Sequence, residues 1–122
     1  MITPIADLPS YVAGFIATGE VTKEDYENVL MPEIERVHKE HGHIHFLFEL
    51  RTKASDFTAG AWWNDAAIGL KHYSDWKKIA IVSDEQVIEK FTNLFSALLP
   101  GKSRGFTLGA LPEAIQWVSA ES

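Results

Sequence analysis

Two kinds of segment alternate along this chain: short, nearly continuous apolar stretches and longer stretches with helical periodicity. Residues 44–50 read Ile-His-Phe-Leu-Phe-Glu-Leu, and residues 78–82 read Lys-Ile-Ala-Ile-Val. Apolar strands of this kind are typical of a sheet whose two faces are both covered by helices. A single helix between successive strands then enforces crossover connections and a mostly parallel sheet. The sequence therefore predicts an α/β fold.

The expected order of elements is β-β-α-β-α-β-α-β-α. Strands are predicted at residues 1–5, 11–18, 44–50, 78–82 and 105–108, and helices at 22–41, 58–76, 84–99 and from 112 to the end. Thr22 and Gly42 are placed to cap the first helix at its two ends, and Pro32 kinks it or starts a second helical piece. We therefore expect a mixed, mostly parallel sheet of four to five strands with about four helices. Ligands of such sheets meet the loops at the carboxyl ends of the strands, here near Arg51, Ser83 and Gly109.

Length and composition limit the classes of protein. At 122 residues, the chain has the size of one domain, so a single domain over residues 1–122 is expected. The absence of cysteine excludes disulfides, thiolate metal sites and thiol nucleophiles. A net charge of −6 argues against a nucleic-acid partner, because such binding needs clustered Lys and Arg. Neither a signal peptide nor an apolar run of about 18 residues is present, which predicts a cytoplasmic location.

Motifs of the common enzyme classes are missing from the sequence. It contains neither G-x-G-x-x-G nor a phosphate-binding G-x-x-x-x-G-K-[ST] loop, and neither G-x-S-x-G nor H-E-x-x-H. Together with the lack of cysteine, this favours a non-enzymatic binding or regulatory module without catalytic residues and without a cofactor.

The helix expected at residues 58–76 carries apolar groups outside its core face. With about 100° per residue, Trp62 lies on the core face, whereas other apolar side chains project onto the polar side. A neighbouring loop covers such side chains, or they meet a ligand, a membrane or a second copy of the chain in a homodimer. The main functional hypothesis is a lid over an apolar small ligand or lipid, or a peripheral membrane contact. Its candidate residues are Phe57, Ala61, Trp62, Trp63 and Ile68.

The polar loop that begins at Arg51 leads into the N-terminus of that helix. Backbone N–H groups at a helix N-terminus receive anions, including phosphorylated side chains. Ser55 and Thr58 are candidate helix caps. The alternative hypothesis is that phosphorylation of Ser55 or Thr58 controls the docking of a regulatory protein.

Four histidines are close in the sequence: His38, His41, His43 and His45. Imidazoles three apart on a helix, or two apart on a strand, share a face and are a possible metal site. They lack a convincing carboxylate or thiolate partner, and the intervening glycine turns the chain between the two pairs. We therefore expect a polar helix end and strand entry without a metal, in which His45 is a hydrogen-bonded buried histidine.

Several segments of the chain form a pattern that is known from one family. They are Gly19 with Val21–Tyr26, Phe46–Leu50, Phe57–Trp63, and Trp76–Val82 followed by Asp84. With these segments the chain resembles, over nearly its whole length, the SpoIIAA-like proteins. These are relatives of the STAS domain of anti-sigma-factor antagonists, and their fold is also similar to CRAL-TRIO lipid-binding domains. The resemblance implies a single STAS-like domain.

The resemblance bears on both functional hypotheses. STAS antagonists carry an Asp-Ser-Ser-Gly-Leu segment whose first Ser is phosphorylated by a partner kinase, and the similar position here is Phe57–Ala61. Gly60 matches and Thr58 takes the place of that Ser, but Phe57 replaces the Asp. The apolar Phe57 and the paired tryptophans resemble CRAL-TRIO domains instead. In those domains a helical gate covers the site of an apolar ligand. Apolar ligand binding is thus the main prediction, and a phosphorylation-controlled interaction is the alternative.

Overall fold

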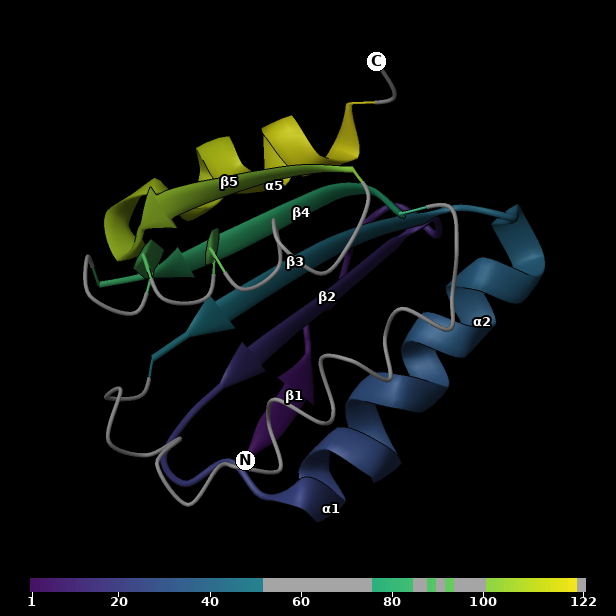
Figure 1. Ribbon diagram of the computed structural model, residues 1–122, viewed down its shortest axis with the longest axis horizontal. Coiled ribbons are helices and arrows are strands. Elements are labelled where there is room, and N and C mark those ends of the chain that lie inside the picture. The colour runs from purple at the N-terminus through teal and green to yellow at the C-terminus, as the bar shows by residue number, and fades with distance from the viewer. Residues whose placement is uncertain (52–75, 85–87, 90–91, 94–100, 121–122) are drawn as a thin grey trace.

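A five-stranded sheet with helices on both faces organises the chain (Figure 1). The computed structural model describes residues 1–51, 76–84, 88–89, 92–93 and 101–120. The strands are β1 (Ile2–Pro4), β2 (Val12–Ala17), β3 (Ile44–Leu50), β4 (Trp76–Ser83) and β5 (Lys102–Thr107). The helical segments are α1 (Lys23–Asp25), the π-helical η1 (Tyr26–Leu30), α2 (Met31–His41), the 3-10 turn η3 (Leu108–Ala110) and α5 (Leu111–Ser119).

The strands lie side by side in the order in which they occur along the chain. β1 pairs antiparallel with β2, whereas β2, β3, β4 and β5 pair in parallel. The predicted opening hairpin is therefore confirmed, and so is the mixed, mostly parallel sheet of an α/β fold. β4 carries one extra residue, Lys77, because Ile44 pairs with Trp76 while His45 pairs with Lys78. An extra residue of this kind is a β-bulge.

The predicted start and end of the first helix are confirmed. The Asp25 backbone N–H donates to Thr22 Oγ1 at 3.1 Å, and the Thr22 backbone N–H donates to Asp25 Oδ2 at 3.1 Å. Burial opposes ionisation of Asp25, but hydrogen bonds from Thr22 and the amino terminus outweigh it and lower the pKa of Asp25. Pro32 lies in the first turn of α2, which starts after the π-helical segment. Gly42 ends α2 with φ 74°, a backbone conformation that glycine adopts without strain.

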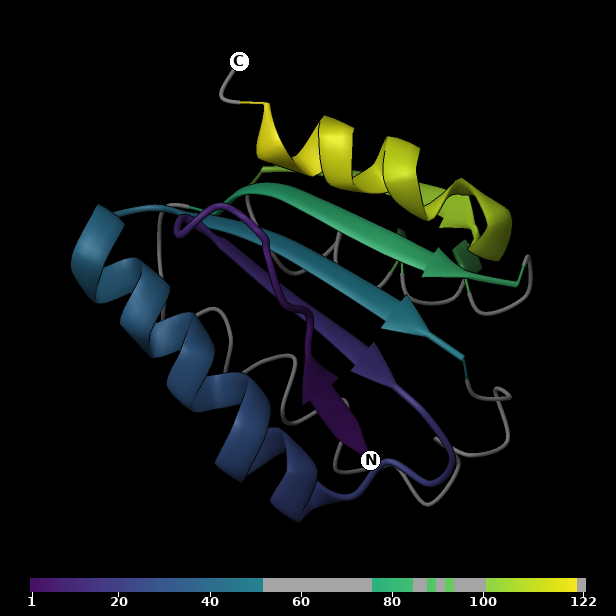
Figure 2. The same cartoon turned by 180° about the vertical axis from the view of Figure 1, so that it is seen from behind.

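The side chains of β3 alternate between two hydrophobic cores, one on each face of the sheet. Phe46 and Phe48 pack with Phe15 of β2 and with Ile34 of α2 on one face. Leu47 packs on the other face with apolar residues of β4, β5 and α5: Ala80, Val82, Phe106, Ala114 and Val118. Figure 2 shows α2 and α5 on opposite sides of the sheet. Both faces of β3 are therefore covered, which explains why its sequence is apolar at nearly every position.

Of the about four predicted helices, two are present in full among the described residues. They are the continuous α1–η1–α2 segment and α5, which has Pro112 in its first turn as expected. Residues 88–89 and 92–93 of the helix predicted at 84–99 are helical, and the Ile88 N–H donates to the Asp84 carbonyl at 2.9 Å. The helix predicted at 58–76 lies outside the described residues, except for Trp76.

Trp76 corrects the predicted end of that helix. It is the first residue of β4, is only 3% exposed, and its ring centre lies 5.8 Å from that of Phe46. The lysines that follow it suggest a helix end in the sequence, whereas in the fold they enter a strand through a bulge. β5 likewise begins three residues earlier than predicted. Its first residues are polar because β5 is an edge strand with exposed side chains.

Candidate functional site

Four parallel strands end on the same side of the sheet, which we call the carboxyl edge. Ala17 at the end of β2 pairs with Leu50 of β3, and Ser83 of β4 pairs with Thr107 of β5. The arrowheads of β2, β3, β4 and β5 in Figure 1 accordingly point the same way. The loops that follow these strands leave from one surface, as the sequence predicts. In open α/β sheets, this is the side at which ligands and partners are bound.

A fully buried carboxylate lies just beneath the carboxyl edge. Glu49 of β3 is 0% exposed and is flanked in the sheet by Ile16 of β2 and Val82 of β4. Arg51 Nε donates to Glu49 Oε2 at 3.0 Å, and Arg51 Nη2 approaches Glu49 Oε1 at 3.5 Å. The Arg51 side chain is itself 56% exposed. Because a buried carboxylate is stable only with a partner, Glu49 holds a cationic group at the surface of the edge.

Backbone contacts hold the ends of the strands in place around Arg51. The Arg51 backbone N–H donates to the Ala17 carbonyl at 2.9 Å, which joins the end of β3 to that of β2. The Ser83 hydroxyl donates to the Leu50 carbonyl at 2.6 Å, which joins the end of β4 to that of β3. Ser83 is only 1% exposed, so its hydroxyl acts inside the structure. The backbone that carries the Arg51 guanidinium group is therefore fixed by hydrogen bonds to the neighbouring strands.

Exposed apolar side chains lie at both ends of the carboxyl edge. The large apolar residues that are exposed within the described part of the chain are Met1, at 62%, and Leu108, at 43%. Met1 lies beside the end of β2, because its carbonyl accepts from the Thr18 N–H at 2.9 Å. Leu108 directly follows β5. Methionine and arginine are enriched in protein interfaces, so this combination of groups suits contact with another protein.

The predicted site residues all lie outside the residues that the structure describes. They are Phe57, Ala61, Trp62, Trp63 and Ile68 of the lid hypothesis, and Ser55 and Thr58 of the switch hypothesis. The chain enters this segment from Arg51, at the carboxyl edge, and leaves it at Trp76, where β4 begins. The segment therefore connects the two opposite edges of the sheet. Its site residues stay predictions.

A family model described as SpoIIAA-like matches residues 12–119. The chain belongs to the SpoIIAA-like family. The resemblance predicted from the sequence is thus confirmed, whereas the similarity to CRAL-TRIO domains stays a prediction. Neither the search of curated proteins nor that of solved structures found a match. Within the described part of this SpoIIAA-like domain, no helix is long and apolar enough to cross a membrane.

The end of α5 is held by three side chains, which we call the α5 clamp: Tyr11, which directly precedes β2, His45 of β3 and Lys78 of β4. The Tyr11 hydroxyl donates to the Ser119 carbonyl at 2.5 Å, His45 Nδ1 bonds the Val118 carbonyl at 2.6 Å, and Lys78 Nζ donates to the Trp117 carbonyl at 2.9 Å. The last carbonyls of a helix lack partners within the helix, and a cation near them is favourable. The clamp therefore serves the attachment of α5 to the sheet.

The clamp accounts for the most deeply placed histidine of the SpoIIAA-like chain. His45 is 2% exposed, and since a carbonyl only accepts, its Nδ1 carries the proton in the bond to Val118. The prediction of a hydrogen-bonded buried histidine is confirmed. His43 Nδ1 is 2.9 Å from the His41 carbonyl, and the ring centres of His43 and His45 are 5.3 Å apart. Three of the four histidines, His41, His43 and His45, therefore do lie together, beside the ring of Tyr11.

The histidine cluster does not have the geometry of a metal site. Among the described residues there is no group of three or more His, Asp or Glu side chains that could hold a metal ion. His41 Nε2 is buried without a hydrogen bond, and Glu40 Oε2 is 3.9 Å from it. That distance is longer than a hydrogen bond.

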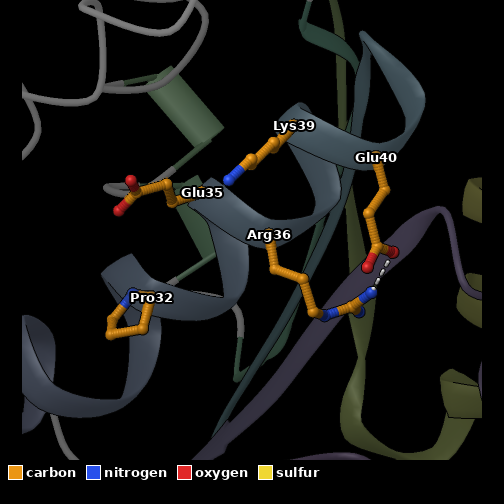
Figure 3. A pocket seen from close by; sticks show the side chains of 5 residues that line it. All are labelled: Pro32, Glu35, Arg36, Lys39 and Glu40. Atoms are coloured by element: carbon orange, nitrogen blue, oxygen red, sulfur yellow. Dashed lines mark hydrogen bonds and ion pairs between the residues drawn. The ribbon is translucent and has the colours of Figure 1, made fainter.

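The outer side of α2 borders a hollow of about 550 Å³ (Figure 3). The described residues that line it are Pro32, Glu35, Arg36, Lys39 and Glu40. Arg36 Nη1 donates to Glu40 Oε2 at 2.7 Å and Arg36 Nε to Glu33 Oε1 at 2.6 Å. The hydrogen bond with Glu33 raises the pKa of Arg36, and the bond with Glu40 adds a smaller contribution. Ligand pockets are mostly apolar, so this charged lining does not suit a lipid.

The Glu49–Arg51 pair leads to a stability prediction. Arg51→Met is expected to lower the free energy of unfolding by about 1–2 kcal/mol, because the buried Glu49 carboxylate loses its cation while Arg51 is half exposed. The measurement is urea unfolding followed by circular dichroism. In the double variant Glu49→Gln/Arg51→Met, most of this loss should disappear.

The matched control for this prediction is Arg36→Met on α2. Arg36 bonds Glu33 and Glu40, but neither is fully buried: the Glu33 side chain is 28% exposed, that of Glu40 52% and that of Arg36 42%. Exposed pairs contribute less than about 1 kcal/mol, so this variant should remain close to the parent protein. If Arg51→Met and Arg36→Met lowered the free energy of unfolding equally, burial of Glu49 would not strengthen its ion pair with Arg51.

Proposed function

We infer that this SpoIIAA-like domain is a non-enzymatic regulatory module that binds another protein at its carboxyl edge, and that phosphorylation of Ser55 or Thr58 controls this binding. The observation that carries the inference is the position of Met1 and Leu108, which expose apolar groups at the two ends of the edge that presents Arg51. Apolar side chains that a partner would cover, together with an arginine, are typical of a protein interface.

The position of the candidate phosphorylation sites supports the regulatory part. Ser55 follows Arg51 by four residues, so covalent geometry alone keeps their Cα atoms within about 14 Å. A phosphoryl group carries almost two negative charges near pH 7, and arginine is a preferred partner of phosphate oxygens. A phosphate on Ser55 would therefore compete for the Arg51 cation, and a phosphate on either residue would repel acidic groups of a docked protein. Membership of the SpoIIAA-like family, whose relatives are anti-sigma-factor antagonists, points to the same kind of regulation.

Apolar ligand binding receives less support. Its residues, from Phe57 to Ile68, lie outside the described part of the chain, and the hollow on α2 is lined by charged side chains. The lipid and membrane hypotheses therefore stay predictions. Analysis of an organic extract of the purified protein distinguishes the lipid hypothesis from the proposal. A defined lipid that accompanies the protein through purification would favour the lid hypothesis.

The test is site-specific crosslinking in the native cell with a photoreactive amino acid at position 108. A partner at the carboxyl edge should give one defined protein adduct there and none from position 35, on the outer side of α2. The variants Ser55→Glu and Thr58→Glu should reduce the adduct at least fivefold relative to Ser55→Ala and Thr58→Ala, since the added charge repels acidic groups of the partner and, at position 55, competes for Arg51.

Two results would contradict the proposal. Equal adducts from positions 108 and 35 would show that the carboxyl edge is not selective. Absence of phosphate on Ser55 and Thr58 under several growth conditions, measured by mass spectrometry of the protein from its own cell, would remove the control by phosphorylation.

A further inference from the structure

β5 is a regular edge strand. It pairs with β4 from Lys102 to Thr107 without a register shift, and within the described residues it has no second strand partner. It contains no proline, which would block further pairing. The backbone N–H and C=O groups on the outer side of an edge strand are a template for another extended chain. β5 therefore has the backbone geometry for strand addition.

Basic side chains gather around the first half of this strand. Lys102 and Arg104 are exposed and lie two residues apart, so they share the face of the sheet with Phe106. The Arg104 guanidinium carbon lies 4.9 Å from the centre of the Phe106 ring, which holds the cation in place. Lys77, the extra residue of the bulge in β4, is also exposed.

These cations are not neutralised by the described residues around them. Within the described part of the chain, Lys77, Lys102 and Arg104 form no ion pair. The described acidic residues nearest in the chain, Asp84 after β4 and Glu113 in α5, follow the carboxyl ends of β4 and β5. The first half of β5 is thus a basic region in a chain with a net charge of −6.

Aromatic rings complete the surface beside Arg104. The ring centres of Phe106 and Trp117 lie 5.9 Å apart, and Trp117 is partly exposed. Lys78 Nζ lies 5.0 Å from the Trp117 ring, but its ammonium group also donates to the Trp117 carbonyl and belongs to the α5 clamp. The partly exposed Trp117 ring therefore lies on the same side of the sheet as the charges of Lys102 and Arg104, whereas Phe106 is buried.

The charge decides which kind of chain fits. Lysines on an edge strand repel basic strands and are costly to cover with apolar ones, whereas opposite charges on neighbouring strands attract. The same residues thus reject most strands and select acidic ones. We propose that the β5 edge binds an extended acidic segment of a partner protein as an additional strand, with Lys102 and Arg104 paired to its carboxylates. This surface lies apart from Arg51 and does not depend on the proposed function.

The test uses a capped peptide of about ten residues in which glutamate alternates with valine, added to the whole ¹⁵N-labelled protein. The amide signals of residues 102–107 should shift most, since their backbone would pair with the peptide. A peptide with lysine in place of glutamate should cause no shift. A glutamate peptide that is N-methylated at every residue should also cause no shift, because it lacks the N–H groups that strand pairing needs.

The variants separate local charge from total charge. Lys102→Gln/Arg104→Gln should weaken peptide binding about fivefold, the effect of two exposed charge pairs. The matched control Lys23→Gln/Lys39→Gln removes two exposed lysines of α1 and α2 and should change affinity less than about twofold. Circular dichroism shows whether each variant is folded.

Several outcomes would overturn the proposal. They are an absence of shifts at residues 102–107, equal binding of the lysine or fully N-methylated peptide, and equal weakening by both double variants. Stronger binding of a single-stranded oligothymidine at the same residues would replace the acidic protein segment with a nucleic acid.

Discussion

Phe46→Ala is expected to lower the free energy of unfolding by about 3–5 kcal/mol. Phe46 is 0% exposed and lies in the middle of β3, in the core under α2. Its ring centre is 6.0 Å from that of Phe15, 5.6 Å from that of Phe48 and 5.8 Å from that of Trp76. Truncation removes buried apolar surface and leaves a cavity that three aromatic rings on rigid strands do not easily fill.

The measurement is denaturant unfolding followed by circular dichroism. Leu108→Ala is the matched control, because Leu108 is 43% exposed and its truncation should change stability by less than about 0.5 kcal/mol. It also removes an apolar group of the carboxyl edge, so it should weaken partner binding while the fold stays intact. A loss below about 1 kcal/mol for Phe46→Ala would contradict the packing around β3.

His45→Leu is expected to lower the free energy of unfolding by about 2–3 kcal/mol. Leucine fills much of the space of the imidazole but has no donor for the Val118 carbonyl, which His45 Nδ1 bonds at 2.6 Å. Val118 is fully buried, so water does not readily replace the lost bond. The loss should be concentrated in α5, where the amides would exchange with solvent hydrogen faster than those of α2.

The conservative control for the clamp is His45→Asn. The asparagine side-chain amide can place a donor near the position of Nδ1, so this variant should recover part of the stability that His45→Leu loses. If Asn and Leu destabilise the protein equally, the histidine contributes by its shape alone. If neither variant changes the exchange of α5, the clamp does not hold the helix.

Local features of the chain were predictable because the groups that make them are neighbours in the sequence. The Thr22–Asp25 capping box joins residues three apart, and Gly42 ends α2 by its own backbone conformation. The buried strand at residues 44–50 was predictable for a related reason, since an apolar residue at nearly every position needs cover on both faces. The family resemblance had the same basis, a series of short segments in the right order.

Features that depend on distant residues could not be predicted. Trp76 reads as the end of a helix, and only pairing with Ile44 across the sheet makes it the start of β4. Glu49 is a single acidic residue in an apolar strand. It is fully buried in a central strand of the sheet, and no local pattern shows which elements enclose it.

The amino-acid sequence was therefore sufficient for the class of fold, the family and the place of the loops at the carboxyl edge, because these follow from periodicity and chain order. The α5 clamp could not be predicted from the sequence, since the bonds of Tyr11 and His45 to α5 join residues that are 108 and 73 positions apart. The same holds for the outer edge of β5, which pairs with no further strand among the described residues, and for the exposed apolar groups at the carboxyl edge. Which side chains meet, and which stay at the surface, depends on the packing of elements that lie far apart along the chain.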